Sequence, residues 1–296
     1  MLFHGLSAFP ITPMDSEGRV DTSALKVLLQ RIDTAGADSV GLLGSTGSYM
    51  YLPRTERRRA IETAVDCLGG RTPLIVGIGA LRTDDAVAFA RDARDAGAQG
   101  LLMAPVSYTP LTDDEVFEHY ATVARAIGLP LSVYNNPGTT HFTIGNALLN
   151  RLAGVETIVA VKNPALSAAD MVAAHRATQA AVPAGFAVGY SGDWLAAGAI
   201  LAGGVTWYSV IAGLLPEPSV KLMRAAQAGD TAEVERINGL FEPFWALFRE
   251  LSSYRVVHAT ANLLGLSSHQ PPRPMLPLAE NERGRLEAAL ESLAGV

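Results

Sequence analysis

Eight short apolar runs, separated by helix-length stretches, are the feature that most constrains how this chain can fold. Most of the runs are rich in Val, Ile or Leu and bounded by Gly or Pro, which is typical of buried strands. They cover residues 6–12, 39–43, 74–78, 100–104, 131–135, 157–161, 186–190 and 205–210. Eight buried strands that alternate with helices predict an α/β fold, a (β/α)8 TIM barrel. A doubly wound open sheet is the alternative that the same alternation allows.

The intervening stretches carry helix signals of their own. Thr112-Asp-Asp-Glu115 is a capping box that opens one of them, and Gly128 ends it. In the stretch after Pro53, we expect the arginines at 57–59 to point outward. Helices are predicted over 21–35, 54–68, 83–96, 112–127, 143–153, 167–180 and 193–202.

The strand signal ends after about residue 214. Helical stretches follow at 217–228, 231–249, 252–264 and near 280–294, with a Pro-rich stretch at 270–277. We therefore predict two parts: a barrel over residues 1–214 and a C-terminal helical region over residues 215–296 that packs on it.

Composition narrows the class of protein. The chain has 296 residues and a net charge of −6 without a basic patch, so nucleic acid is not an expected partner. A single cysteine, Cys67, rules out an intrachain disulfide and suits a reducing compartment, so we expect a cytoplasmic protein. No apolar run reaches the roughly 18 residues of a membrane span, and the N-terminus lacks the pattern of a signal peptide.

Lysine is scarce in this chain, and one lysine stands out. Lys26 and Lys221 fall in helical stretches, whereas Lys162 ends the apolar run that starts at Ile158. A charged amine among apolar side chains is costly unless it has a function, and imine formation with a carbonyl substrate is the usual one. Tyr134 ends the preceding strand, at the same end of the predicted barrel, where it could move a proton next to such an imine.

The turn Gly44-Ser45-Thr46-Gly47 follows the second predicted strand and precedes a helix. Two hydroxyls and several free backbone N–H groups make such a turn a site for a small anion, although Gly-rich turns of this kind are common in α/β folds. Lys162, Tyr134 and this turn together predict a site for a 2-oxo acid, whose carboxylate binds the turn while its carbonyl carbon meets the amine.

These motifs resemble those of the pyruvate-dependent class I aldolases typified by dihydrodipicolinate synthase and N-acetylneuraminate lyase. The likeness runs along nearly the whole chain, through residues 5–13, 41–47, 134–138, 161–162 and 203–209. It implies a Schiff-base-forming lyase without a cofactor, cytoplasmic and a homo-oligomer, either a dimer or a tetramer. Its substrates are pyruvate or a related 2-oxo acid and an aldehyde.

The resemblance also implies roles for single residues. Lys162 is the Schiff-base lysine, Tyr134 the proton-shuttling tyrosine, and Ser45 a catalytic relay residue that also binds substrate. Further substrate-binding residues are expected at Thr46, Gly47, Thr139, Asn163 and Tyr208.

Three positions depart from the dihydrodipicolinate synthase pattern. Ser48 stands where those enzymes usually have Glu, and Thr139 where an Arg usually binds the carboxylate of the aldehyde substrate. Ser107 stands where a Tyr usually reaches across a subunit interface, and Tyr108 is its neighbour. The pyruvate half of the site is retained and the aldehyde half is altered, which favours another acceptor. A 2-keto-3-deoxy sugar-acid aldolase or dehydratase is the first alternative.

Other interpretations have weaker support. A barrel that has lost catalysis and serves as a small-acid sensor remains open, but retention of Lys162 with Tyr134 speaks against it. The six histidines show no metal-ligand spacing, so no metal is expected. His141 is interpreted as a surface residue of its loop. Asp193 either binds substrate hydroxyls or caps the helix that follows it.

Overall fold

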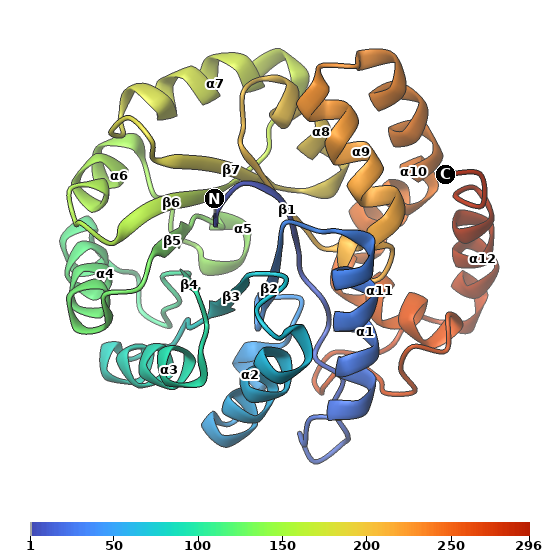
Figure 1. The fold of residues 1–296 in the computed structure, drawn as a ribbon, viewed down its shortest axis with the longest axis horizontal. Coiled ribbons are helices and arrows are strands. Elements are labelled where there is room, and N and C mark those ends of the chain that lie inside the picture. Colours follow the sequence, from blue (N-terminus) through green and yellow to red (C-terminus); the bar gives the residue numbers. More distant parts are fainter. Residues whose placement is uncertain (1) are drawn as a thin grey trace.

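A closed barrel of parallel strands forms the centre of the computed structural model, which describes residues 2–296 (Figure 1). Each strand pairs with the next in sequence, and β8 pairs with β1. Within the described residues the strands are β1 (Gly5–Ala8), β2 (Ser39–Leu42), β3 (Leu74–Gly77), β4 (Gly100–Met103), β5 (Leu131–Tyr134), β6 (Ile158–Pro164), β7 (Ala187–Ser191) and β8 (Thr206–Ser209). The predicted (β/α)8 barrel is confirmed, and the open-sheet alternative is excluded.

Two strands differ by three or more residues from the predicted extent, and the other six differ by only one residue at either end. β1 ends at Ala8. The apolar run continues to residue 12 because Phe9 and Ile11 are buried in the connection that leaves the strand. β6 continues to Pro164, because its last residues pair with β7. Lys162 therefore lies inside a strand rather than at its end.

Helices surround the barrel between successive strands (Figure 1). Their bounds are α1 (Thr22–Ala35), α2 (Arg54–Leu68), α3 (Thr83–Ala96), α4 (Asp113–Ile127), α6 (Asn146–Ala153), α7 (Ala168–Ala180), α8 (Asp193–Leu201) and α9 (Pro216–Ala228). The capping box of Thr112 and Glu115 is present at the start of α4. A four-residue helix that the sequence did not predict, α5 (Pro137–Thr140), follows β5. Three short 3-10 helices complete this description: η1 (Tyr49–Tyr51), η2 (Ile211–Gly213) and η3 (Glu280–Glu282).

The outward orientation predicted for Arg57 is wrong. Its side chain is buried, with the guanidinium carbon 4.0 Å from the centroid of the Phe89 ring. It donates hydrogen bonds to the backbone oxygens of Leu52 and Gly79. Burial on the apolar face of α2 is compensated by these acceptors and by the aromatic ring.

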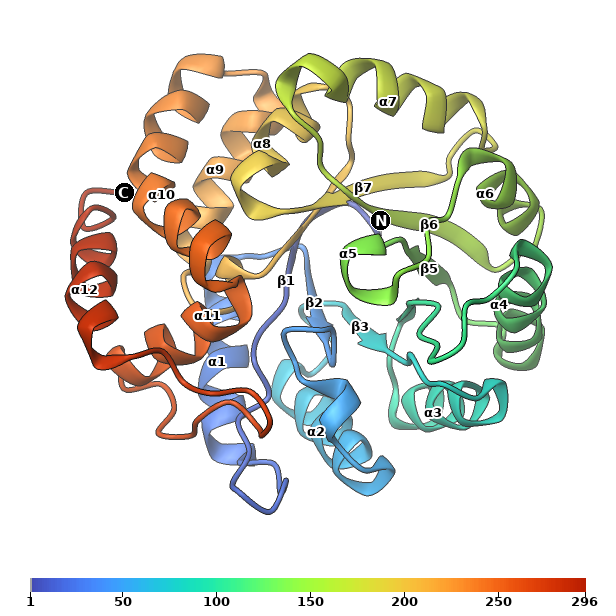
Figure 2. The ribbon, with the colours of Figure 1, turned by 180° about the vertical axis from the view of Figure 1, so that it is seen from behind.

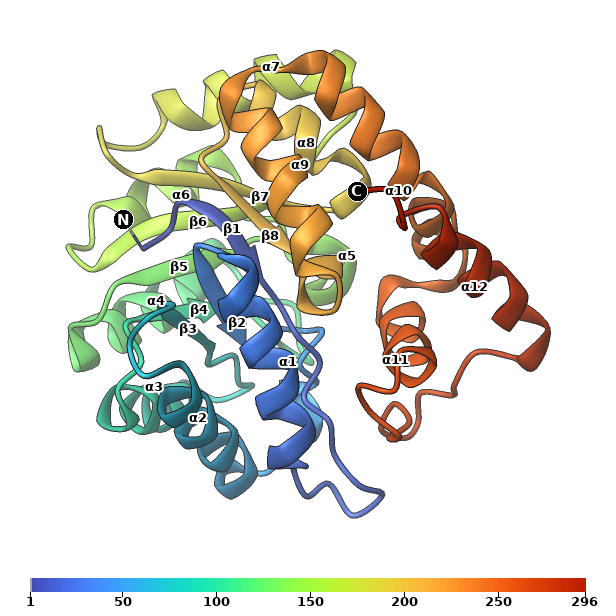
Figure 3. The same ribbon diagram turned by 45° about the vertical axis from the view of Figure 1, so that its right-hand side comes forward.

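The C-terminal region adds α10 (Thr231–Leu251), α11 (Ser253–Leu263) and α12 (Arg283–Glu291) on one side of the barrel (Figure 3). α9 packs against both α8 and α1, so it completes the ring of barrel helices, although the predicted division at residue 214 assigns it to the C-terminal region. None of the helices in residues 2–296 is long and apolar enough to cross a membrane.

His258 is buried in α11 without a hydrogen bond. Only 3% of its surface is exposed, and neither imidazole nitrogen has a partner within residues 2–296. Burial lowers the pKa of His258 from 6.5 to about 4, because the charged ring would lose its hydration.

We therefore expect acid to destabilise the protein through His258. The unfolded chain takes up this proton as the pH falls below about 6.5, whereas the folded chain resists it down to about pH 4. The free energy of unfolding should fall by about 3 kcal/mol across that window, and this contribution is fully present only above it. Urea titrations of wild type and His258→Leu between pH 7 and pH 4 measure it.

His141→Asn is the matched control, because it removes an exposed histidine. The expected result is a smaller loss of stability toward low pH in His258→Leu alone. Equal slopes for His258→Leu and wild type would contradict the assignment.

Candidate active site

A cavity of about 450 Å³ opens at the carboxyl ends of the strands, where α5 and α11 lie (Figure 2). Its lining comes from the barrel loops and from the C-terminal region. The residues are Ser45, Thr46, Met50, Tyr51, Tyr134, Asn136, Thr139, Lys162, Pro164, Ala165, Ser191, Gly192, Asp193, Trp194, Val210, Phe248, Ser252, Ser253, Tyr254 and Met275. Five of the predicted site residues therefore line the same cavity: Lys162, Tyr134, Ser45, Thr46 and Thr139.

Lys162 is held by aromatic rings. Its Nζ lies 4.1 Å from the ring centroid of Tyr134 and 4.2 Å from that of Phe9, and its side chain is buried. It forms no salt bridge with any acidic residue in the described part of the chain. Aromatic rings therefore hold the side chain in place while no acidic residue of the described part engages its nitrogen, which leaves Nζ free to meet a carbonyl carbon in the cavity.

Tyr134 and Lys162 are register partners on neighbouring strands, which fixes their proximity through the backbone. The Tyr134 hydroxyl oxygen accepts a hydrogen bond from Nδ2 of Asn136 at 3.0 Å. The same amide nitrogen donates to Oγ1 of Thr139 at 2.9 Å. Asn136 thus positions both the phenol and the threonine, a role that the sequence did not reveal.

Asn135, its neighbour, has a different function. Its amide nitrogen donates to the oxygen of Ile144 and to Oδ1 of Asn163, and its own Oδ1 accepts from the Ile144 N–H. These bonds fix the loop after β5 on the outside of the barrel. Asn135 therefore stabilises the loop after β5, whereas Asn136 positions side chains of the cavity.

The Gly44–Gly47 turn has the free donors that the sequence suggested. Within residues 2–296 the backbone N–H groups of Ser45, Thr46 and Gly47 make no hydrogen bond. Gly47 does not line the cavity; a Cβ there would lie 3.0 Å from the backbone of Leu43, so the close packing of the turn favours glycine. Ser45 and Thr46 carry the side chains that face the cavity.

Besides Gly47, two predicted substrate-binding residues lie outside the cavity. Side chains alternate along a strand, so Asn163 points away from the barrel interior that Lys162 occupies, and it lines a separate hollow beside α6 and α7. Tyr208 lies beneath the cavity and is fully buried, with its ring centroid 5.5 Å from Nζ of Lys162. Direct contact with substrate is therefore not available to either side chain in this arrangement.

Asp193 neither caps α8 through its side chain nor offers free oxygens to a substrate. It accepts hydrogen bonds from the Trp207 indole at 2.9 Å and from the backbone N–H groups of Val210 and Ile211 at 3.0 and 2.8 Å. Burial raises the pKa of Asp193, and these donors oppose the rise. Its carboxylate holds the loop after β8 in place.

Of the three departures from the family pattern, only Thr139 lines the cavity. Ser48 shares a hydrogen bond of 2.6 Å with the Tyr254 hydroxyl, which joins the turn after β2 to α11. Burial raises the pKa of Tyr254 to about 12, so its phenol is a neutral group of the cavity wall. Ser107 donates to the oxygen of Thr109, and Tyr108 is 97% exposed, so neither reaches the cavity.

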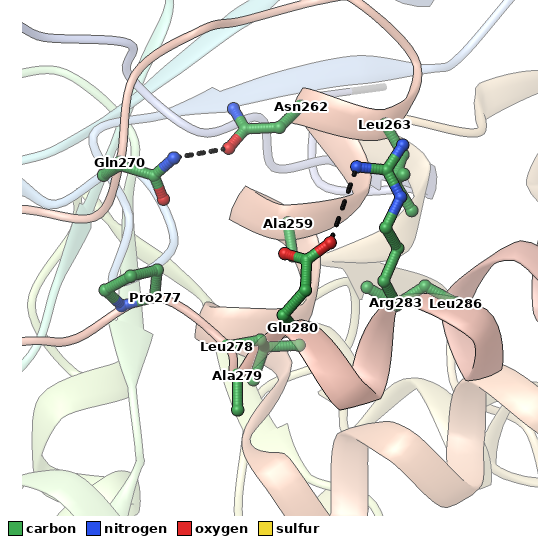
Figure 4. A pocket seen from close by; sticks show the side chains of 10 residues that line it. All are labelled: Ala259, Asn262, Leu263, Gln270, Pro277, Leu278, Ala279, Glu280, Arg283 and Leu286. Atoms are coloured by element: carbon green, nitrogen blue, oxygen red, sulfur yellow. Dashed lines mark hydrogen bonds and ion pairs between the residues drawn. The ribbon is translucent and has the colours of Figure 1, made fainter.

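A second cavity, of about 390 Å³, lies between α11 and α12 (Figure 4). Gln270 donates to Asn262 at 3.0 Å and Arg283 pairs with Glu280 at 4.0 Å, and the remaining lining is apolar. This lining has no lysine, cysteine or tyrosine, so it offers no amine, thiol or phenol for covalent catalysis. Residues 2–296 contain no cluster of three or more His, Cys, Asp or Glu that could hold a metal ion.

Comparison with known proteins agrees with this geometry. A model of the dihydrodipicolinate synthetase family matches residues 2–293. The 4-hydroxy-tetrahydrodipicolinate synthase of Acidiphilium cryptum is 32% identical over 99% of both chains. The crystal structure of dihydrodipicolinate synthase from Agrobacterium tumefaciens is 57% identical, covering 99% of this chain and 98% of that chain, with a TM-score of 0.97. That of the Acinetobacter baumannii enzyme complexed with pyruvate is 27% identical over 100% of both chains, with a TM-score of 0.91.

Proposed function

The chain belongs to the dihydrodipicolinate synthetase family, a family of pyruvate-dependent Schiff-base aldolases, and we propose that Lys162 is its imine-forming residue. The protein is a lyase of the class I aldolase type that acts on pyruvate or a related 2-oxo acid. The observation that carries the assignment to Lys162 is its buried amine, beside Tyr134 at the base of the cavity.

In the first step Nζ of Lys162 attacks C2 of pyruvate, and loss of water from the adduct gives an imine. The imine withdraws electrons, so a proton leaves C3 and an enamine forms. C3 of the enamine then attacks the carbonyl carbon of the aldehyde, whose oxygen takes up a proton. Water hydrolyses the new imine, which releases a 4-hydroxy-2-oxo acid and restores the free amine.

We assign the proton transfers to Tyr134. Its phenol is supported by the N–H of Asn136, a donor that stabilises negative charge on the oxygen while a proton is away. Ser45 lies in the same cavity as a second hydroxyl for this relay. The Asn136 bond comes from the same chain, which supports a relay that needs no tyrosine at position 107.

We assign the carboxylate of pyruvate to the turn of Ser45 and Thr46. The unpaired backbone N–H groups and two hydroxyls there supply hydrogen bonds to an anion. An acceptor aldehyde then has the outer part of the cavity, beside Thr139. No cofactor is needed for this sequence of steps, because the covalent imine supplies the electron sink.

Trapping tests the proposal. The protein is incubated with pyruvate and sodium borohydride and weighed intact, and the modified peptide is mapped. Reduction of the imine should fix one pyruvate unit on Lys162. Failure to trap an adduct with pyruvate or with longer 2-oxo acids would point to the alternative, a barrel that binds small acids without catalysis.

Replacing Asn136 should separate proton transfer from imine formation. Asn136→Leu removes the donor to the Tyr134 phenol and leaves the amine in place. A lost hydrogen bond to a group that becomes charged costs roughly 1.5–3 kcal/mol, so we expect kcat to fall about tenfold or more. The yield of trapped pyruvate should change little. Asn135→Leu is a poor control because that residue fixes a loop, whereas Asn136→Gln retains an amide and should recover part of the rate.

We also propose that the protein works in the cytoplasm as a dimer or tetramer of identical chains. The single cysteine supports a reducing compartment. The exposed ring of Tyr108, in the loop after β4, supports a contact with another subunit.

A further inference from the structure

We propose that the acceptor of this enzyme is an uncharged, hydroxylated aldehyde rather than one that carries a carboxylate. This inference rests on the proposed function and concerns the outer part of the same cavity. It assigns the substrate class that the family relationship leaves open.

The charge of the cavity lining is the first argument. Lys162 is the only Lys, Arg or His among its residues, all of which belong to the described part of the chain. Lys162 is occupied once the imine with the 2-oxo acid has formed. A second carboxylate would therefore enter a partly buried site that has no remaining cationic side chain, and its lost hydration would go uncompensated.

The position that could have held a cation carries Thr139. Thr139 lines the cavity, and its Oγ1 accepts a hydrogen bond from Asn136. Arg273 is the nearest arginine in sequence to the lining residue Met275, but it is exposed and lines another hollow, together with Asp15 and Glu17. No other arginine is brought to the lining by the fold of residues 2–296.

Asp193, the acidic residue of the lining, does not make the cavity more favourable for a second carboxylate. Both carboxylate oxygens of Asp193 are used by the Trp207 indole and by backbone N–H groups of the loop after β8. Its negative charge, where present, would repel a second carboxylate further.

Hydroxyl groups replace the missing charge. Thr139, Ser191 and Tyr254 line the cavity from three different elements, and Ser252 and Ser253 add two more hydroxyls at the start of α11. Hydroxyls both donate and accept, so they match the hydroxyls of a sugar-like aldehyde without a net charge. Phe248, Trp194 and Met275 close the remaining wall with apolar surface.

The reaction with such an acceptor is balanced without a further reactant. Pyruvate and glyceraldehyde, for example, combine through C3 of the enamine and the aldehyde carbon. The proton lost from C3 is matched by the one gained by the aldehyde oxygen, and the water released in imine formation is returned on hydrolysis.

A matched pair of aldehydes tests the charge argument. Succinic semialdehyde and its methyl ester share one carbon chain and differ in a carboxylate against a neutral ester. With saturating pyruvate, we expect kcat/KM for the ester to exceed that for the free acid at least tenfold. Glyceraldehyde and propanal test the hydroxyls in the same way, and glyceraldehyde should be preferred.

Thr139→Arg supplies the missing cation. We expect it to raise kcat/KM for succinic semialdehyde relative to its ester about tenfold, the effect of one ion pair of roughly 1.4 kcal/mol. His141→Arg adds the same charge two positions away, at an exposed residue outside the lining, and should leave the ratio unchanged. Arg273→Gln should also leave it unchanged.

The outcomes separate this inference from the proposed function. A trapped pyruvate adduct with equal or better use of the free acid would overturn the acceptor class and leave the Schiff-base assignment intact. Equal use of propanal and glyceraldehyde would remove the hydroxylated part of the proposal. An enzyme that forms the adduct but turns over none of the uncharged aldehydes would refute it entirely. Absence of the adduct would instead be a failure of the proposed function.

Discussion

Replacing Lys162 by Ala is expected to bring turnover down to the uncatalysed background and to abolish the pyruvate adduct. The side chain is buried against the rings of Phe9 and Tyr134, and Lys162 is the only lysine in the cavity lining, so no other side-chain amine can take its place. Its removal takes away the only covalent electron sink in the mechanism. Intact mass after borohydride trapping and steady-state rates measure both effects.

The scarcity of lysine provides matched controls. Lys26 and Lys221 are exposed on α1 and α9, and their replacement by Ala should leave the adduct and the rate unchanged. Lys162→Met fills the space that Ala leaves empty, so a loss of activity shared by both variants cannot be ascribed to a collapsed cavity. Full activity in Lys162→Ala would disprove the mechanism.

Replacing Tyr134 by Phe is expected to reduce kcat by roughly 10²–10⁴-fold, the usual contribution of a general acid–base group. The ring that contacts Lys162 is kept, and only the hydroxyl that accepts from Asn136 is lost. The pyruvate adduct should therefore still form, but slowly. Rapid-quench trapping compares the rate of imine formation with the overall rate.

Tyr208→Phe is the control for this variant. Tyr208 also presents its ring to Lys162, but its hydroxyl faces Ser132 at 3.3 Å below the cavity. We expect a change of less than about tenfold, because a buried hydroxyl of this kind is worth about 1 kcal/mol. Equal losses in the two variants would show that the phenol of Tyr134 has no special part in catalysis.

The barrel and the central pair of the site could be predicted because their signals are local. Apolar runs fixed the strands, and the scarcity of lysine together with the strand-end position singled out Lys162 and Tyr134. The register of β5 and β6 then places the two side chains together. Arg57 could also have been found, because it shares a helical face with Ala60, Ile61 and Ala64, all of which are buried.

The remaining residues depended on contacts that no local pattern contains. Tyr254 meets Ser48 across about two hundred positions of sequence, and only the packing of α11 brings them together. Asn135 and Asn136 are adjacent and identical in type, yet Asn135 bonds to Asn163 outside the cavity and Asn136 bonds to the Tyr134 phenol. Asn163 follows Lys162 in the sequence but does not line its cavity, since neighbouring residues of a strand face opposite sides.

The hydrogen bond between Ser48 and Tyr254 joins the barrel to the C-terminal helices, and both parts of the chain contribute residues to the cavity. The barrel supplies the amine, the phenol and the anion turn, whereas α10, α11 and the junction between them supply Phe248, Ser252, Ser253 and Tyr254. Exchange of the segment after residue 230 between relatives should consequently shift the preference among aldehydes, within the limits that Thr139 and Ser191 of the barrel set, while the pyruvate chemistry stays with the recipient. Changes in the C-terminal helices of such an enzyme can alter its range of aldehyde substrates while the nucleophilic lysine is retained.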